Sequence, residues 1–201
     1  LVLIGAGGHA HACIDVIERL PQYKIAGLVG RSQELGDLHL GYPVIGTDAE
    51  LGRIVQQHRF AIISVGQIGA ADTRERLYQC ARRGGFTLPS IISPLASVSR
   101  HAIIGPGSIV MHGAIVNAGA VVGENCIVNS NALIEHDAVV EDHCHVSTGA
   151  ILNGSVRVSS GSFIGSGSIL KEAIVIGRGC LIGMGLSVRH DIPDGKVYLG
   201  K

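Results

Sequence analysis

Apolar residues recur every six positions along the second half of the chain. Starting at Val98, sixteen consecutive positions spaced by six carry Val, Ile or Leu, and the last of them is Val188. The residue two positions before each is mostly small, as at Ala96, Cys126 and Ala150. A six-residue unit is too short for a pair of helices but long enough for one short strand and one corner. The pattern predicts a three-sided β-helix of about five coils, with eighteen residues per coil and the aliphatic side chains inside.

The first half alternates short apolar runs with segments of helical periodicity. The runs predict strands, and the periodic segments, two of which follow capping signals, predict helices. We expect strands at 1–4, 24–29, 60–66 and 86–92, and helices at 9–20, 47–58 and 71–84. This alternation is typical of a small α/β, Rossmann-like parallel sheet with flanking helices. We therefore predict two domains, residues 1–92 and residues 93–201.

A glycine-rich turn follows the first expected strand. The sequence IGAGGHAHA places Gly5, Gly7 and Ala10 in a GxGxx[GA] pattern, which lets backbone N–H groups approach a phosphate at a helix N-terminus. Dinucleotide-binding turns also expect an acidic residue at the end of the second strand. This chain has Gly30 and Arg31 there, which are candidate nucleotide-sugar contacts. A nucleotide diphosphate therefore fits this turn better than NAD does.

Three more residues belong to the same expected rim of the sheet. His9 lies where its side chain could reach the phosphates or the sugar, with a capping or solvent-facing histidine as the alternative. Gly66 and Gln67 end the third expected strand. Ligands of open parallel sheets bind at the carboxyl ends of the strands, so both are candidate nucleotide-sugar contacts.

The stretch LIEHDAVVEDHCHVSTG contains three histidines. In the six-residue register, His136 follows the inward Ile134 by two positions and should face outward at a corner. His145 directly precedes the inward Val146, in a column of mostly aliphatic residues. A polar residue in place of an apolar one in this column suggests a groove. His143 falls on another corner. Three histidines on different edges do not converge as metal ligands must, so we expect no metal site.

Composition excludes several classes of function. Lys+Arg and Asp+Glu are both 16, Trp is absent and aromatic residues make up 3% of the chain, so we expect no nucleic-acid binding. No apolar stretch has membrane-spanning length, so we expect no membrane insertion. The five cysteines form no CxxC pair, which favours a reduced, cytoplasmic setting, and three of them share the column of small inward residues: Cys126, Cys144 and Cys180. We expect these three to pack rather than react.

One stretch resembles a known family. NSNALIEHDAVVEDHCHVSTGAILNGSVRV is similar to the N-x-x-x-x-I-E-H and H-V-S-x-G motifs, followed by a Gly, of acetyl-CoA-dependent hexapeptide-repeat sugar acyltransferases. The nearest branch is the UDP-4-amino-sugar N-acetyltransferases of bacillosamine synthesis, and the sialic acid O-acetyltransferases are similar. The resemblance implies a left-handed parallel β-helix behind the nucleotide-binding domain. It also implies a homotrimer, which would cover the outward apolar residues of the β-helix faces.

The resemblance assigns roles to individual residues. It implies that His136 is the general base and that Asp137, where the relatives carry Glu, raises its basicity. It places acetyl-CoA contacts at four positions, of which the last two match by spacing alone: His145, Gly154, Ser166 and Met184. It places the phosphate turn at Gly7, Gly8 and His9. Acetyl-CoA is then a co-substrate, no cofactor is permanently bound, and the acceptor is a UDP-linked amino sugar.

The expected reaction is direct acetylation of a sugar 4-amino group. His136 takes the proton, the amine attacks the thioester, and a backbone N–H or His145 stabilises the oxyanion. One alternative is O-acetylation of sialic acid or another sugar hydroxyl. An alternative of another class is a nucleotide-binding or NAD-binding module whose β-helix serves only for oligomerisation. An ice-binding β-helix would need outward Thr ladders, and Thr148 is the only Thr after residue 98.

Overall fold

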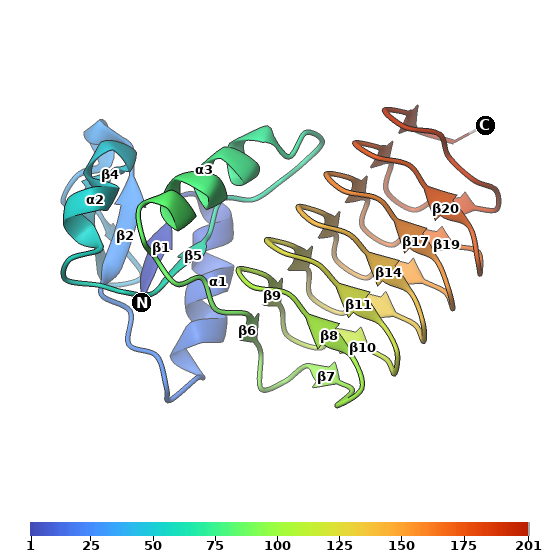
Figure 1. Cartoon of the computed structure of the whole chain (residues 1–201), viewed down its shortest axis with the longest axis horizontal. Helices are drawn as coiled ribbons and strands as arrows, with labels where there is room; N and C mark the ends of the chain where they lie inside the picture. Colours follow the sequence, from blue (N-terminus) through green and yellow to red (C-terminus); the bar gives the residue numbers. More distant parts are fainter. Residues whose placement is uncertain (201) are drawn as a thin grey trace.

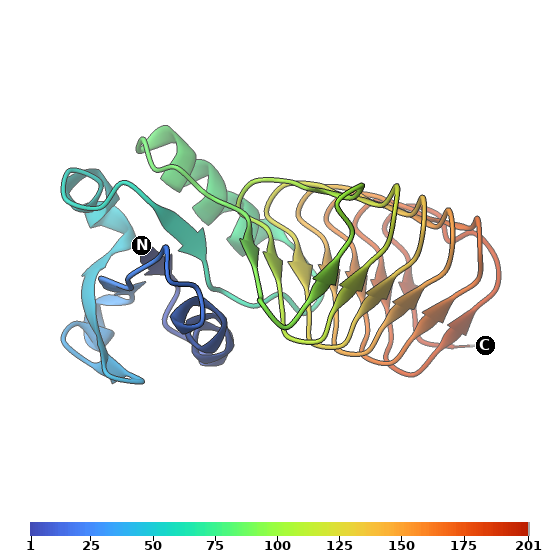
Figure 2. The same ribbon diagram turned by 90° about the horizontal axis from the view of Figure 1, so that it is seen from below.

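The computed structural model describes residues 1–200 and consists of a small α/β domain followed by a β-helix (Figures 1 and 2). The α/β domain contains a five-stranded sheet of order β3-β4-β2-β1-β5, in which only the β3–β4 pair is antiparallel. Its elements are β1 (Val2–Ile4), α1 (Gly8–Glu18), β2 (Gly27–Gly30), β3 (Leu38–His39), β4 (Tyr42–Thr47), α2 (Leu51–Ile54), β5 (Ala61–Ile63) and α3 (Asp72–Arg83).

The two faces of this sheet are covered by different partners. Leu3 belongs to one apolar cluster with the buried side of α1 and with Ile109 and Ile127 of the β-helix. Val2 and Ile4, which point the opposite way along the same strand, pack with residues of α2 and α3. Burial on both faces explains why β1 is apolar at every position.

Three details differ from the sequence-based prediction. The helix expected at 47–58 is a short 3-10 turn at Asp48–Glu50 followed by the single-turn α2, and Gly52 within it lowers the helix propensity. The antiparallel hairpin of β3 and β4 was not predicted. The strand expected at 86–92 is divided, because Thr87 pairs with Phe60 of the α/β domain whereas Ile91–Ile92 forms β6 of the β-helix.

The second half is a left-handed parallel β-helix with three faces. The face that packs against the α/β domain is called the docked face. Its strands are β6, β9 (Ile109–Val110), β12 (Ile127–Val128), β15 (His145–Val146), β18 (Phe163–Ile164), β21 (Leu181–Ile182) and β23 (Val197–Tyr198). The second face contains β7 (Ser97–Val98), β10 (Ile115–Val116), β13 (Leu133–Ile134), β16 (Ile151–Leu152), β19 (Ile169–Leu170) and β22 (Ser187–Val188). The third face contains β8 (Ile103–Ile104), β11 (Val121–Val122), β14 (Val139–Val140), β17 (Arg157–Val158) and β20 (Val175–Ile176).

The aliphatic residue of each six-residue unit points into the β-helix, as predicted. Positions of the aliphatic column from Val110 to Val188 are at most 1% exposed, whereas Val98 and Ile104 at the open first coil are partly buried. Neighbouring strands on a face pair in register eighteen residues apart, as in Ile127↔His145. Many corners contain a residue with positive φ three positions before the inward aliphatic, a conformation that favours Gly, Asn or Asp.

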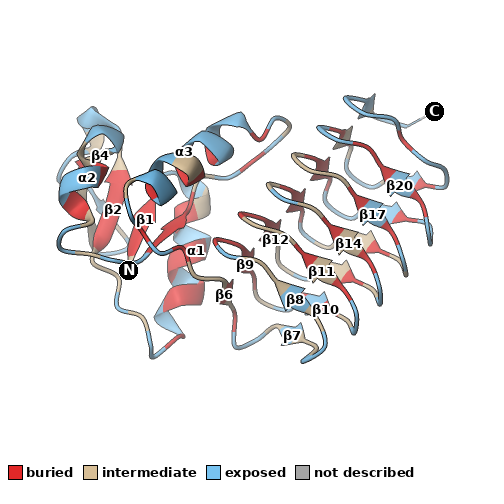
Figure 3. Ribbon diagram, in the orientation of Figure 1, coloured by how far each residue is buried: buried red, intermediate tan, exposed pale blue. Residues whose placement is uncertain are grey.

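Both edges of the docked face contact the α/β domain. At the edge between the docked and second faces, His112 Nε2 lies 2.7 Å from Asp15 Oδ2 of α1. At the edge between the third and docked faces, Glu124 accepts hydrogen bonds from Tyr78 at 2.8 Å and Arg82 at 3.0 Å, both on α3. The remaining edge, between the second and third faces, is called the far edge. Figure 3 shows that outward residues of the third face are largely exposed or intermediate.

No helix in residues 1–200 is long and apolar enough to cross a bilayer.

Candidate active site

His136 stands on the far edge of the β-helix. It lies in the corner between β13 and β14, where Asp137 adopts a φ of +60°. The His136 side chain is 63% exposed, and its Nδ1 lies 2.9 Å from Asp137 Oδ2. Because a carboxylate only accepts, the proton resides on Nδ1 and Nε2 remains the free basic nitrogen. The hydrogen bond to Asp137 raises the pKa of the His136 ring, and the charges of Asp137 and Glu135 add to this effect.

The backbone around His136 leaves room at the basic nitrogen. Gly154 lies one coil further along the same edge, and a Cβ there would come within 2.7 Å of both Nε2 and Cε1 of His136. Glu135 Oε2 accepts a hydrogen bond from the His136 backbone N–H at 3.2 Å and another from Asn117 at 2.9 Å. The corner therefore holds the His136 backbone through Glu135, and the lack of a side chain at Gly154 lets the imidazole lie close to the next coil.

A second group of predicted residues surrounds a cavity of about 760 Å³ between the α/β domain and the docked face. The glycine turn contributes Gly7, Gly8 and His9, the end of β5 contributes Gly66 and Gln67, and the β-helix contributes His145, Ser166 and Met184. A Cβ at Gly7 or Gly8 would meet no described atom within 4 Å, so this turn has open space in front of the α1 N-terminus. Sequence reasoning missed the other lining residues, which are Val65, Ile68, Asn129, Ser147, Phe163, Gly165, Leu181 and Gly183.

His145 is a buried, neutral histidine in this cavity. Its Nδ1 lies 2.6 Å from the Gln67 carbonyl oxygen, so Nδ1 carries the proton and donates it. Its Nε2 then accepts from Asn129 Nδ2 at 3.1 Å. Burial lowers the pKa of His145 to about 4. Since its single N–H is used by Gln67, the ring has no N–H left for an oxyanion.

Two polar atoms at the cavity lack partners. Within residues 1–200, neither His9 Nε2 nor Gln67 Oε1 has a hydrogen-bond partner, although both are buried. Burial lowers the pKa of His9 to about 3, so its ring is neutral at physiological pH. Buried polar atoms without partners are costly, which indicates that a bound polar molecule would satisfy them.

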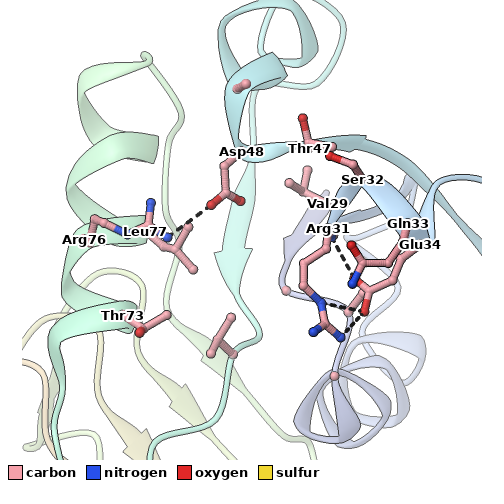
Figure 4. Close-up of a pocket in the computed structure, with 16 residues that line it drawn as sticks. Val29, Arg31, Ser32, Gln33, Glu34, Thr47, Asp48, Thr73, Arg76 and Leu77 are labelled. Carbon is pink, nitrogen blue, oxygen red and sulfur yellow. Dashed lines mark hydrogen bonds and ion pairs between the residues drawn. The ribbon is translucent and has the colours of Figure 1, made fainter.

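A neighbouring cavity of about 600 Å³ lies over the carboxyl ends of β1, β2 and β4, and it contains the predicted Gly30 and Arg31 (Figure 4). The Arg31 side chain turns back onto Glu34, with nitrogens 3.0 and 2.6 Å from Oε1. On the opposite wall, Arg76 pairs with Asp48 at 3.2 Å. Gly7 lines both cavities, so the glycine turn separates two adjoining sites at the rim of the sheet.

The predicted residues thus fall into two separate groups. Gly7, Gly8, His9, Gly66, Gln67, His145, Ser166 and Met184 share the larger cavity, and Gly30 and Arg31 lie next to it. His136, Asp137 and Gly154 lie on the far edge, the only edge that makes no ion pair with the α/β domain among the described residues. His143 forms the corner beside α3, where it contacts Tyr78 and Asn125. Residues 1–200 contain no cluster of three or more side chains suited to a metal ion.

Known proteins resemble the chain in both halves. Residues 1–80 match the PglD N-terminal domain family. The acetyltransferase domain of PglB from Neisseria gonorrhoeae, solved with acetyl coenzyme A, superposes with a TM-score of 0.88 at 35% identity, covering 96% of this chain and 92% of that one. A histidine-to-asparagine mutant of perosamine N-acetyltransferase from Caulobacter crescentus, solved with CoA and GDP-perosamine, has a TM-score of 0.87 at 30% identity, covering 96% and 90%.

A more distant structure shows the fold alone. WeeI from Acinetobacter baumannii superposes with a TM-score of 0.86 at 21% identity over 97% of this chain and 94% of that one. No curated protein matches the sequence significantly. The identity and coverage of the Neisseria and Caulobacter structures, together with the α/β domain and the six-residue repeat, establish that the chain belongs to the hexapeptide-repeat sugar acyltransferase family.

Proposed function

We propose that the chain is an acetyl-CoA-dependent N-acetyltransferase that acts on the 4-amino group of a UDP-linked amino-dideoxy sugar. The observation that carries this proposal is the state of His136: its Nδ1 is bound by Asp137, its Nε2 is free, and Gly154 leaves space beside it. An exposed imidazole in this arrangement suits a general base. Related structures solved with acetyl coenzyme A, or with CoA and GDP-perosamine, support the two substrate classes.

The reaction is a direct transfer. His136 Nε2 removes a proton from the attacking amine, whose nitrogen lone pair forms the new bond to the thioester carbon. Collapse of the tetrahedral intermediate breaks the C–S bond, and coenzyme A leaves as a thiolate that takes up a proton. The products are the N-acetyl sugar and free coenzyme A. No covalent enzyme intermediate forms, so both substrates must be bound at the same time.

The position of the two residue groups supports a site shared between subunits. His136 and Gly154 lie on the far edge, whereas Ser166 and Met184 lie on the edge between the docked and second faces. In a homotrimer of parallel prisms, the far edge of one subunit adjoins this other edge of the next. The outward residues Ile115 and Ile169 of the second face, 39% and 42% exposed, would be covered by such contacts.

The nucleotide is proposed to occupy the rim of the α/β domain. The open turn at Gly7 and Gly8 faces the N-terminus of α1, where a diphosphate is stabilised by backbone N–H groups and the helix dipole. The adjoining cavity with Gly30 and Arg31 would take the nucleoside. Because acetyl-CoA and sugar nucleotides are cytoplasmic metabolites, we place the reaction in the cytoplasm.

A transfer assay with purified protein tests the proposal. Acetyl-CoA is offered with UDP-4-amino-4,6-dideoxy-N-acetylglucosamine, a GDP-linked amino sugar and sialic acid, for wild type, His136→Asn and His101→Asn. His101 is an exposed histidine on the same far edge, two coils away, and serves as the matched control. We expect N-acetylation of the UDP sugar, a loss on the order of a hundredfold in His136→Asn, and no change in His101→Asn.

Two results would contradict the proposal. Near-normal turnover in His136→Asn would exclude this residue as the base. Acetyl transfer to sialic acid with none to the amino sugars would replace N-acetylation by O-acetylation.

A further inference from the structure

Arg74 is a buried arginine that connects the two domains. It lies on α3, is 1% exposed, and is not part of the cavity lining. One guanidinium nitrogen donates to the carbonyl oxygens of Ile63, at 3.0 Å, and of Val65. The other donates to Asn125, at 3.2 Å to the backbone oxygen and 2.9 Å to Oδ1. Arg74 therefore joins the end of β5 to a corner of the β-helix.

Burial of the Arg74 guanidinium is energetically unfavourable. No carboxylate of residues 1–200 lies within ion-pair distance of its guanidinium, and its Nε has no hydrogen-bond partner among them. A buried cation without a counter-ion destabilises a fold relative to a well-packed apolar side chain of similar size. Packing alone therefore does not explain Arg74, and the groups that it holds in place indicate another role.

One of the groups that Arg74 holds belongs to the wall of the cavity. Val65 is followed by Gly66 and Gln67, and all three line the cavity. The carbonyl of Gln67 accepts the Nδ1–H of His145. Arg74 thus fixes the first residue of a three-residue wall whose last residue orients the histidine. Its positive charge also adds to burial in lowering the pKa of both His9 and His145.

We propose that Arg74 is a positioning residue for the cavity between the domains: by joining Val65 to Asn125, it fixes the Gln67 carbonyl and thereby the ring of His145. It acts through the backbone and touches no substrate. This role deepens the proposed function. The kinetic test of it rests on that function, whereas the NMR test depends only on the fold.

The test uses Arg74→Met, Arg74→Lys and a matched control, Arg82→Met. Arg82 lies on the same helix and also reaches the β-helix, through Glu124 at 3.0 Å, but it makes no contact with β5. Imidazole nitrogen NMR on histidine-labelled intact protein reports the Nδ1–H of His145. Steady-state kinetics report kcat and the KM values for acetyl-CoA and for the nucleotide sugar.

The proposal predicts a specific pattern. In Arg74→Met, the His145 Nδ1–H signal shifts and exchanges faster with water, and kcat/KM falls about tenfold or more, mainly through KM because His136 on the far edge is unaffected. Arg74→Lys retains a donor and recovers part of both effects. Arg82→Met behaves like wild type in both measurements.

Wild-type NMR and kinetics in a folded Arg74→Met protein would overturn the proposal, as would equal effects of Arg82→Met. If Arg74→Met does not fold, Asn125→Gly provides the same test, since glycine suits the φ of +53° and removes the side-chain acceptor of Arg74 together with the contact to His143, which lies outside the cavity. It should shift the His145 signal in the same direction, and an unchanged signal would overturn the proposal. If wild type acetylates no acceptor, the proposed function fails, while the NMR signal still decides on Arg74.

Discussion

Two histidines of the same chain are set to opposite states by their surroundings. His136 is exposed, and its hydrogen bond to Asp137 raises its pKa, so the surroundings favour the protonated ring. His145 is buried and its pKa falls to about 4, so the ring is a fixed neutral hydrogen-bonding group. Groups whose environments separate their pKa values in this way commonly divide the tasks of an active site, with one transferring protons and the other orienting. This division argues for His136, rather than His145, as the base.

The pH dependence of the reaction should reveal the effect of Asp137. A raised pKa means that the folded protein favours the protonated ring, so the neutral base appears only above a pH higher than the ordinary histidine value of about 6.5. In Asp137→Asn the favourable charge is lost, and the acidic limb of the kcat/KM profile should move to lower pH. Kinetics between about pH 5 and pH 9 measure this limb. An unchanged limb, or one moved to higher pH, would contradict the role given to Asp137.

At the scale of the element, the six-residue repeat determines most of the second domain. The sequence alone predicted its faces, its inward column and the outward placement of His136, because a strict period leaves few other ways to bury the aliphatic residues. The α/β domain was less predictable. Its short α2 and the β3–β4 hairpin depend on single capping and turn residues rather than on a long pattern. Before α2, Glu50 accepts a hydrogen bond from the Thr47 backbone N–H at 2.9 Å, and the hairpin turn contains Gly41 with a positive φ.

The inward cysteines of the β-helix should not react during acetyl transfer. Cys126, Cys144 and Cys180 are fully buried within the β-helix core, and burial raises the pKa of Cys144 well above that of a free thiol. Each should therefore be replaceable by Ala with little change in kcat or KM, because direct transfer needs no acyl-enzyme. Kinetics of the three single variants check this expectation. Mass spectrometry of wild type mixed with acetyl-CoA provides the control, since an acetyl thioester on any of these cysteines would disprove direct transfer.

At the scale of the whole molecule, the contacts between domains decide where the site lies. The meeting of Gln67 with His145 links residues 78 positions apart, and it depends on which prism face packs against α1 and α3. No local pattern encodes that choice. The sequence therefore pointed to both histidines and to His9 and Gln67 as candidate contacts, but not to the meeting of His145, His9 and Gln67 in one cavity, or to Arg74. The acyltransferase family and the fold were predicted and are confirmed. The roles of the individual site residues and the homotrimer stay predictions.

The proposed site is complete only where the far edge of one subunit meets the cavity of another. Complementation between inactive subunits tests it most directly. At substrate concentrations below KM, His136→Asn chains are expected to be nearly inactive alone. His145→Asn chains are expected to be strongly impaired, because the cavity loses the ring that Gln67 and Asn129 hold. Co-assembled in equal amounts, about a quarter of the shared sites would combine an intact His136 with an intact His145 from the neighbour. We predict that acetyl transfer returns to roughly that fraction of the wild-type rate, whereas mixed assemblies no more active than their parents would contradict a site built from two subunits.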